Sequence, residues 1–211
     1  MKLIIFGATG TLGRHLVVQA LAQGHTVTAF SRHPASINFE HQSLRGRAGN
    51  VLDVDSVMGA VQGHDAVLIA LGAGHKGIVR SMGTRHIVTA MQAQGIRKLV
   101  CMSSLGAGDS RPVLNFFWKH IMFGFLLKKA MDDHNAQEAI VRRADIDWTI
   151  ARPAAFTNGE ATGEYKHGDL SDSARDGGKL KFKISRADVA GFLLKQLSDD
   201  RYLRQTPGLS Y

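Results

Sequence analysis

Three glycines stand three residues apart near the start of the chain, where their surroundings indicate what they do. Gly7, Gly10 and Gly13 lie in GATGTLG, directly after the apolar run KLIIF and at the start of the amphipathic stretch TLGRHLVVQALAQG. Glycine lets a backbone turn sharply, approach a ligand without a Cβ, and pack a helix close to a sheet. The free N–H groups at a helix N-terminus attract phosphate. The spacing therefore predicts a dinucleotide pyrophosphate at this turn; the alternative is a merely tight strand-to-helix turn.

The residues after the second apolar run bear on which dinucleotide fits. HTVTAF is followed by Ser31, Arg32 and His33, and no acidic residue occurs before Glu40. An NAD site places a carboxylate here for the ribose hydroxyls, whereas a guanidinium pairs well with the 2′-phosphate of NADP. We therefore expect NADP(H) as the cofactor, with Arg32 on the 2′-phosphate. The alternative for Arg32 is an arginine in a solvated loop.

Short apolar runs alternate with amphipathic stretches along the chain and would position these residues. Buried strands are predicted over residues 2–6, 25–30, 42–48, 65–71, 97–104 and 147–153. Helices are predicted over residues 11–24, 53–63, 77–94 and 129–144. Nearly all-apolar strands that alternate with helices predict an α/β protein with a doubly wound, mostly parallel sheet (Rossmann fold) and helices on both faces. We expect residues 1–211 to form a single NAD(P)-binding domain.

Composition and charge exclude several classes of protein. The 26 Lys and Arg residues exceed the 18 Asp and Glu residues, which gives a net charge of +8, but the basic residues are spread along the chain. Nucleic acid is therefore not an expected partner. KLIIF is too short for a signal peptide, no membrane span is expected, and no metal site is predicted. The single cysteine, Cys101, excludes an internal disulfide and favours a reducing, cytoplasmic location; we interpret it as a small buried hydrophobe.

The order of motifs resembles the atypical short-chain dehydrogenases/reductases of the NmrA-like group, and within it the NADPH flavin reductases. The stretches that carry the resemblance are GATGTLG, VTAFSR, GNVLD, DAVLIALG, LVCMSS, DDH at 132–134, DWTIARPAAFTNG and ISRADVAGFLLKQL. They run nearly end to end. The cofactor-binding residues that the resemblance implies are Gly7, Thr9, Gly10, Thr11, Leu12, Gly13, Arg32, Asn50, Val51, Leu71, Gly72, Ala73, Ser103, Pro153, Ala154, Ala155 and Phe156.

The resemblance also divides these residues by role. The glycine turn holds the pyrophosphate, and Asn50 and Val51 flank the adenine. Residues 71–73 pass beneath the ribose and nicotinamide, and residues 153–156 offer backbone groups to the carboxamide. Ser103 is implied as a catalytic residue beside the nicotinamide. His134 stands where related sequences carry a lysine and is the second catalytic candidate; the alternative is an exposed helix histidine.

One pair of residues typical of short-chain dehydrogenases is missing. Those enzymes protonate an alkoxide with a tyrosine whose pKa is lowered by a lysine four residues later, but Asp169 and Thr206 stand four residues after Tyr165 and Tyr202. Without such an acid an unactivated ketone is hard to reduce, whereas flavins and quinones delocalise the arriving charge. We therefore expect an NADPH-dependent oxidoreductase, monomeric or homodimeric, with a flat conjugated small molecule as acceptor. The alternatives are a non-catalytic NADP-sensing regulator that binds a partner protein and, with less support, an isomerase or epimerase.

A segment rich in aromatic residues, PVLNFFWKHIMFGFLL at 112–127, is longer here than in the flavin reductases. It is too short to span a membrane and has Lys119 and His120 in its middle. We expect it to form an apolar wall over the nicotinamide, with Phe117 and Trp118 stacking on the acceptor. A core or subunit-interface segment and a helix on a membrane surface are the alternatives.

Overall fold

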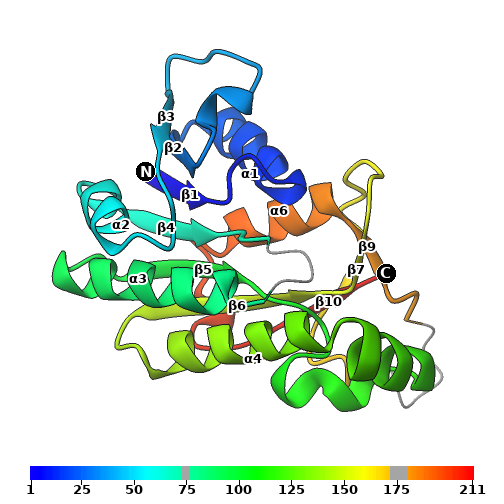
Figure 1. The fold of residues 1–211 in the computed structure, drawn as a ribbon. Helices are drawn as coiled ribbons and strands as arrows, with labels where there is room; N and C mark the ends of the chain where they lie inside the picture. The colour runs from blue at the N-terminus through cyan, green and yellow to red at the C-terminus, as the bar shows by residue number, and fades with distance from the viewer. Residues whose placement is uncertain (73–76, 172–179) are drawn as a thin grey trace.

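The computed structural model describes residues 1–72, 77–171 and 180–211. An eight-stranded sheet with the order β3-β2-β1-β4-β5-β6-β10-β8 runs through the molecule (Figure 1). Its neighbouring strands are parallel except for the pair β10 and β8. The strand order reverses at β1, which lies between β2 and β4, and ligands of such sheets bind beyond the carboxyl ends of the strands near this reversal. The predicted α/β, mostly parallel Rossmann fold is confirmed.

The elements follow one another as strand and helix through most of the chain. The strands of the main sheet are β1 (Lys2–Phe6), β2 (Thr26–Ser31), β3 (Leu44–Ala48), β4 (Ala66–Ile69), β5 (Lys98–Met102), β6 (Asp147–Pro153), β8 (Lys166–Gly168) and β10 (Gly208–Ser210). A small parallel sheet pairs β7 (Ala155–Thr157) with β9 (Lys183–Ser185). The α-helices are α1 (Thr11–Ala22), α2 (Val54–Val61), α3 (Val79–Ala93), α4 (Lys128–Arg143) and α6 (Arg186–Lys195). Short 3-10 turns are η1 (Pro34–Ser36), η2 (Gly108–Val113) and η4 (Asp200–Tyr202), and η3 (Phe117–Leu126) is a π-helix.

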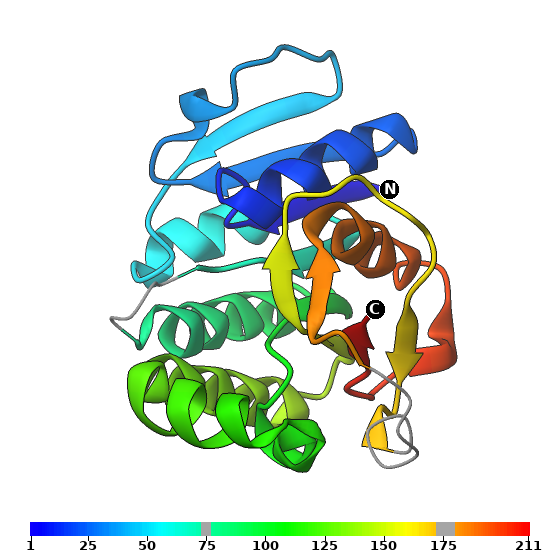
Figure 2. The same ribbon diagram turned by 90° about the vertical axis from the view of Figure 1, so that its right-hand side faces the viewer.

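The sheet is buried on both faces, which explains its nearly all-apolar strands. Within β1, Leu3 and Ile5 belong to one core, and Ile4 and Phe6 belong to the other. Helices α1 and α6 cover the first face, and helices α2, α3 and α4 cover the second (Figures 1 and 2). Because successive side chains of a strand point to opposite faces, both faces need apolar residues, and no polar alternation remains in the sequence.

The predicted strands and helices through residue 153 are present, with ends that differ by a few residues. Helix α1 ends at Ala22, and Gly24 then adopts φ +79°, a left-handed conformation that glycine adopts without strain. Strands β8 and β10 were not predicted. Each is three residues long, and β10 extends the sheet by pairing in parallel with Arg152 and Pro153 of β6.

Candidate functional site

The turn between β1 and α1 is built from glycines whose missing side chains leave room for backbone. Gly7 has φ +87°, and a Cβ on it would lie 2.4 Å from the carbonyl oxygen of Ala70. A Cβ on Gly13 would lie 2.1 Å from the carbonyl oxygen of Gly7, so α1 packs directly on the turn. Gly10 is the N-cap of α1, where no described side chain caps the helix and no acidic residue occupies the first turn. The helix N–H groups are thus available to an anion, which fits the pyrophosphate of a dinucleotide.

The residues expected around the adenosine follow the carboxyl ends of β2 and β3. These strands pair in parallel, so Arg32 and Asn50 leave the same edge of the sheet, and Arg32 is exposed there. The Asn50 side chain accepts a hydrogen bond from the backbone N–H of Leu52 (3.1 Å). Val51 is buried against α3, where a Cβ on Gly83 would lie 2.7 Å from the Cγ2 of Val51.

Arg14 is a residue of this region that the sequence analysis missed. Its Nε donates to the Thr9 carbonyl oxygen (3.2 Å) and its Nη2 to the Ser36 carbonyl oxygen (2.9 Å). The side chain therefore ties the glycine turn to η1, which lies just after Arg32. The signal for it was present, because an arginine directly after the last glycine of the motif must lie in the first turn of α1.

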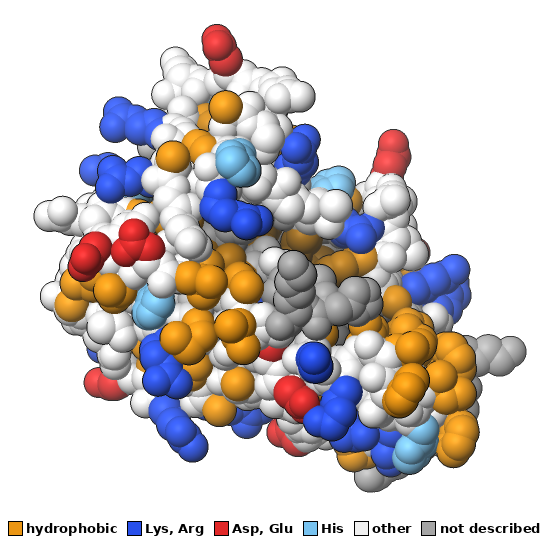
Figure 3. Space-filling model, in the orientation of Figure 1, with side chains coloured by type: hydrophobic (Ala, Val, Ile, Leu, Met, Phe, Trp, Pro, Cys, Tyr) orange, Lys and Arg blue, Asp and Glu red, His pale blue; other side chains and the backbone are white. Residues whose placement is uncertain are grey.

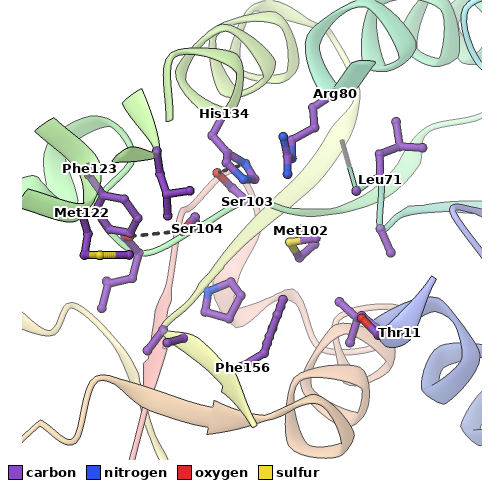
Figure 4. A pocket seen from close by; sticks show the side chains of 18 of the residues that line it. Thr11, Leu71, Arg80, Met102, Ser103, Ser104, Met122, Phe123, His134 and Phe156 are labelled. Atoms are coloured by element: carbon purple, nitrogen blue, oxygen red, sulfur yellow. Dashed lines mark hydrogen bonds between the residues drawn. The ribbon is translucent and has the colours of Figure 1, made fainter. Parts of the chain in front are cut away.

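A cavity of about 400 Å³ lies beside the glycine turn, at the carboxyl ends of β1, β4, β5 and β6 (Figure 4). This volume falls within the range of small-molecule sites. The expected site residues that line it are Gly10, Thr11, Leu12, Leu71, Gly72, Ser103, Trp118, His134, Pro153, Ala154, Ala155 and Phe156. Those that do not line it are Gly7, Thr9, Gly13, Arg32, Asn50, Val51 and Phe117. Ala73 lies outside the described residues.

Ser103 and His134 meet at the wall of this cavity from two different elements. Ser103 follows β5, and its backbone N–H donates to the Ala151 carbonyl oxygen of β6 (2.8 Å). His134 lies on α4 and is 7 % exposed, so it is not the exposed helix histidine considered above. The Ser103 Oγ and the His134 Nδ1 are 3.5 Å apart, at the upper limit of a hydrogen bond (Figure 4).

The imidazole of His134 is neutral at physiological pH. Burial lowers the pKa of His134 to about 3, and the positive charge of the nearby Arg80 lowers it further than Asp133 raises it. A neutral imidazole can donate one N–H hydrogen bond to a bound ring, but it holds no extra proton to give at pH 7. The site therefore positions polar groups without providing a charged acid.

Helix α4 is fixed on both sides of His134 by buried polar contacts. On the α3 side, the Gln137 side chain donates to the Thr84 hydroxyl (3.0 Å). On the β6 side, Arg152 donates to both carboxylate oxygens of Glu138 (2.9 and 2.6 Å) and also pairs with Asp109. The Arg152 guanidinium holds the pKa of the Asp109 carboxyl below its ordinary value. These contacts hold the helix, and so the His134 ring, at a constant place along the cavity.

The aromatic segment forms one wall of the cavity and has a second, exposed face. Its lining residues are Leu114, Trp118, Met122, Phe123 and Leu127, and the Trp118 and Phe123 rings are 5.6 Å apart. Phe117 points elsewhere and is 51 % exposed. Figure 3 shows the exposed hydrophobic side chains gathered at the lower right beside Lys and His residues. The large exposed residues there are Phe116, Phe117, Ile121, Phe125 and Leu126.

A π-helix explains which side chains face the cavity. The N–H of Leu127 bonds to the carbonyl oxygen of Met122 (2.7 Å), five residues earlier. This winding brings residues four to five apart onto one side, which fits Trp118, Met122, Phe123 and Leu127. An α-helical spacing would have grouped them differently.

Arg80, Met102 and Phe182 also line the cavity, although the sequence analysis did not select them. Arg80 is the second residue of α3, the helix that follows β4, so its place near the carboxyl edge of the sheet could have been inferred from the element order. Met102 is the last residue of β5, and its apolar surroundings in the sequence predict only a core residue. Phe182 directly precedes β9 and has φ +49°. No sequence pattern predicts that its side chain lies at the cavity.

The tyrosines of the chain lie away from the cavity. The Tyr202 hydroxyl bonds to the His167 Nδ1 (2.7 Å), and the Tyr211 hydroxyl donates to Asp188 (2.6 Å). Burial raises the pKa of Tyr165, with the charge of Asp188 adding to the effect. Within the described residues, no cluster of His, Cys, Asp or Glu could hold a metal ion, and no helix is long and apolar enough to cross a membrane.

Known proteins of similar sequence and structure agree with this geometry. A family described as NAD(P)H-binding matches residues 7–200. The protein YMR090W of Saccharomyces cerevisiae is 27 % identical over 212 residues, covering 93 % of this chain and 87 % of that protein. A short-chain dehydrogenase/reductase from Veillonella parvula in complex with NADP has a TM-score of 0.82 at 17 % identity, covering 100 % of this chain and 94 % of that one. ChuY, an anaerobillin reductase from Escherichia coli O157:H7, has a TM-score of 0.77 at 23 % identity, covering 99 % and 96 %. The chain belongs to the NAD(P)H-binding family and has a Rossmann-like fold.

Proposed function

We propose that the chain is an NADPH-dependent reductase that passes a hydride to a flat, conjugated acceptor such as a flavin or a quinone. The observation that carries the proposal is a single cavity with two different ends. Thr11 of the glycine turn and Phe123 of the aromatic segment lie on opposite sides of it (Figure 4), and Gly10 and Trp118 also line it. A dinucleotide whose pyrophosphate lies on α1 would place its nicotinamide in this cavity, facing the aromatic wall.

The preference for NADP(H) over NAD(H) rests on the exposed Arg32 at the carboxyl end of β2. Among the described residues none is shown to bind its guanidinium, which can pair with a 2′-phosphate, and no acidic side chain stands between β2 and Glu40 to repel that group. The NADP held by the Veillonella parvula relative supports this choice.

The chemistry of the cavity matches an acceptor that needs no protonation during hydride transfer. When bound, NADPH supplies the hydride. Trp118, Phe123 and Met122 provide an apolar surface for an acceptor ring and exclude water, while Ser103 and the neutral His134 orient the reacting rings by hydrogen bonds. This division of roles is typical of reactions in which the acceptor itself spreads the charge.

Sequence and structural likenesses support a reductase of this kind. The motif order resembles biliverdin reductase B, the NADPH flavin reductase, and ChuY is described as an anaerobillin reductase. Ala155 stands where biliverdin reductase B carries a histidine near its substrate, so we propose a flavin or quinone rather than the same tetrapyrrole. Burial strongly raises the pKa of the Cys101 thiol, which leaves it inert, and we place the activity in the reducing cytoplasm.

Steady-state oxidation of NADPH, with riboflavin, FMN and quinones offered in parallel, tests the proposal. Trp118→Ala should raise KM for the acceptor by about 5- to 150-fold, the range that a stacking loss of roughly 1–3 kcal/mol per ring produces. Phe117→Ala is the matched control, because its ring belongs to the same segment but lies outside the cavity.

Both variants should bind NADPH with unchanged affinity in calorimetry. If the protein binds NADPH but reduces none of these acceptors, the catalytic proposal is wrong and the non-catalytic NADP-sensing regulator takes its place. If Phe117→Ala raises KM as much as Trp118→Ala does, the cavity is not the acceptor site.

A further inference from the structure

Arg80 is a buried cation whose hydrogen-bonding capacity is not used by the described residues. It is the second residue of α3, it is 9 % exposed, and its guanidinium points into the cavity beside the His134 ring (Figure 4). Its Nε and Nη1 are buried, and no described atom accepts a hydrogen bond from them. Burying a hydrogen-bond donor without a partner costs folding free energy. A buried arginine of this kind in the wall of a cavity therefore indicates a ligand site.

Asp133 is the carboxylate nearest to this guanidinium, but its oxygens already serve the N-terminus of α3. Oδ2 accepts from the backbone N–H of Arg80 (3.1 Å), and Oδ1 accepts from the backbone N–H and the hydroxyl of Ser81 (3.0 and 2.6 Å). The Arg80 Nη1 lies 3.5 Å from Asp133 Oδ2 without a hydrogen bond. Asp133 therefore caps the helix and forms an ion pair with Arg80, while Nε and Nη1 of Arg80 lack a hydrogen-bond acceptor among the described residues.

Beyond the ion pair with Asp133, the residues that line the cavity bring no negative charge to Arg80. Among the described lining residues, His134 is the one other titratable group, and none is acidic. The burial that lowers the pKa of His134 keeps its ring neutral, so the ring adds no charge to the cavity at pH 7. The cavity is thus apolar on the side of Trp118 and carries the Arg80 guanidinium on another side.

We propose that Arg80 binds the negative charge that reaches the acceptor ring with the hydride, an inference that rests on the proposed function. The hydride forms a bond to one ring atom while its C–H bond to NADPH breaks, so NADPH is oxidised to NADP⁺ and the acceptor is reduced. The electron pair of the opened double bond moves onto a conjugated nitrogen or oxygen, which becomes the anion, and water protonates it after release. Arg80 supplies a preorganised positive charge where a general acid would otherwise act.

The acceptor is the one reactant in this cavity that becomes negative. The phosphates of the cofactor fit the free N–H groups of α1 at Gly10, and the oxidised nicotinamide is itself a cation that Arg80 would repel. An acceptor that gains an electron pair in this cavity lies beside the positive charge of Arg80, which lines the same cavity.

The inference is tested by comparing hydride transfer to an acceptor that becomes an anion with hydride transfer to a cationic acceptor that becomes neutral. Riboflavin becomes an anion on receiving a hydride, whereas the N-methylacridinium cation becomes neutral. Arg80→Gln should slow single-turnover reduction of riboflavin by about 100-fold or more, as the loss of an oxyanion donor does, and leave acridinium reduction within about threefold of the wild type. Arg80→Lys should keep part of the riboflavin rate. Arg85→Gln is the matched control, an exposed arginine on the same helix.

Ligand binding without turnover gives an independent measurement. With NADP⁺ present, the wild type should bind 2-naphthoate more tightly than 2-naphthamide, and Arg80→Gln should lose this preference. Equal slowing with both acceptors, or a loss of NADPH affinity in Arg80→Gln, would show a structural or cofactor role and overturn the inference. If the wild type reduces neither acceptor, the proposed function fails, while the naphthoate comparison still tests Arg80.

Discussion

Acidification should destabilise this protein through one histidine. His134 is buried, and burial together with the charge of Arg80 lowers its pKa to about 3 from the ordinary value of 6.5. Between these two values the unfolded chain binds a proton that the folded chain does not. The stabilisation is therefore complete above pH 6.5 and is lost progressively as the pH falls toward 3. With about 1.4 kcal/mol for each pH unit, the loss between pH 7 and pH 5 is about 2 kcal/mol.

Urea unfolding at pH 7 and pH 5, at constant ionic strength, measures this loss. The wild type should lose about 2 kcal/mol more unfolding free energy than His134→Gln over this interval, a large share of the roughly 5–15 kcal/mol that stabilises a typical domain. His33→Gln, at an exposed histidine, should behave as the wild type does. His25 and His167, whose pKa values burial also lowers, remain in every variant and cancel in the comparison. Parallel losses in the wild type and His134→Gln would refute the assignment of a neutral, buried imidazole.

Three further changes probe the cofactor turn and the support of α4. Gly13→Ala should abolish tight NADPH binding in calorimetry, because the new Cβ would lie 2.1 Å from the Gly7 carbonyl oxygen; a variant that binds normally would contradict the packing of α1 on the turn. The wild type should bind NADPH at least about tenfold more tightly than NADH, a gap of about 1.4 kcal/mol, and Arg32→Ala should close most of it. Equal wild-type affinities would remove Arg32 from the site. Glu138→Ala should destabilise the fold in urea unfolding by up to about 3–5 kcal/mol, since it removes the buried carboxylate of Arg152 and leaves the more exposed Asp109 as its remaining partner. A cost below about 1 kcal/mol would mean that Asp109 or water compensates the charge of Arg152.

The cofactor half of the molecule could be predicted from the sequence because its signals are local. A run such as KLIIF is apolar since both faces of β1 are covered, and the glycine turn follows it directly. The later strands β8 and β10 had no such signal. Each is three residues long and is defined by its pairing with a distant partner, Gly208 with both Gly168 and Arg152, which no local pattern records.

The direction in which side chains point was the second feature of the site that the sequence did not predict. The aromatic segment was expected at the cavity with Phe117 and Trp118 together, but adjacent residues of a helix point in different directions, and the π-helical winding could not be read from composition. Arg80 escaped selection for a related reason. What distinguishes Arg80 is that two of its side-chain nitrogens have no hydrogen-bond acceptor among the described residues, because the Asp133 carboxylate is used by the N-terminus of α3. Such a feature depends on three-dimensional contacts and cannot be read from the sequence.

The contact between α1 and α6 has a consequence for how the protein is made. Gln19 of α1 donates to the Ala187 carbonyl oxygen of α6 (2.9 Å), and Leu16 and Val17 share a core with Leu193. Ribosomes add about 5–20 residues per second, so α1 emerges many seconds before α6 exists. The glycine turn and α1 are therefore synthesised early, but α1 can pack against α6 only late in synthesis. We therefore expect a nascent chain that ends before α6 to bind NADPH more weakly than the complete fold does.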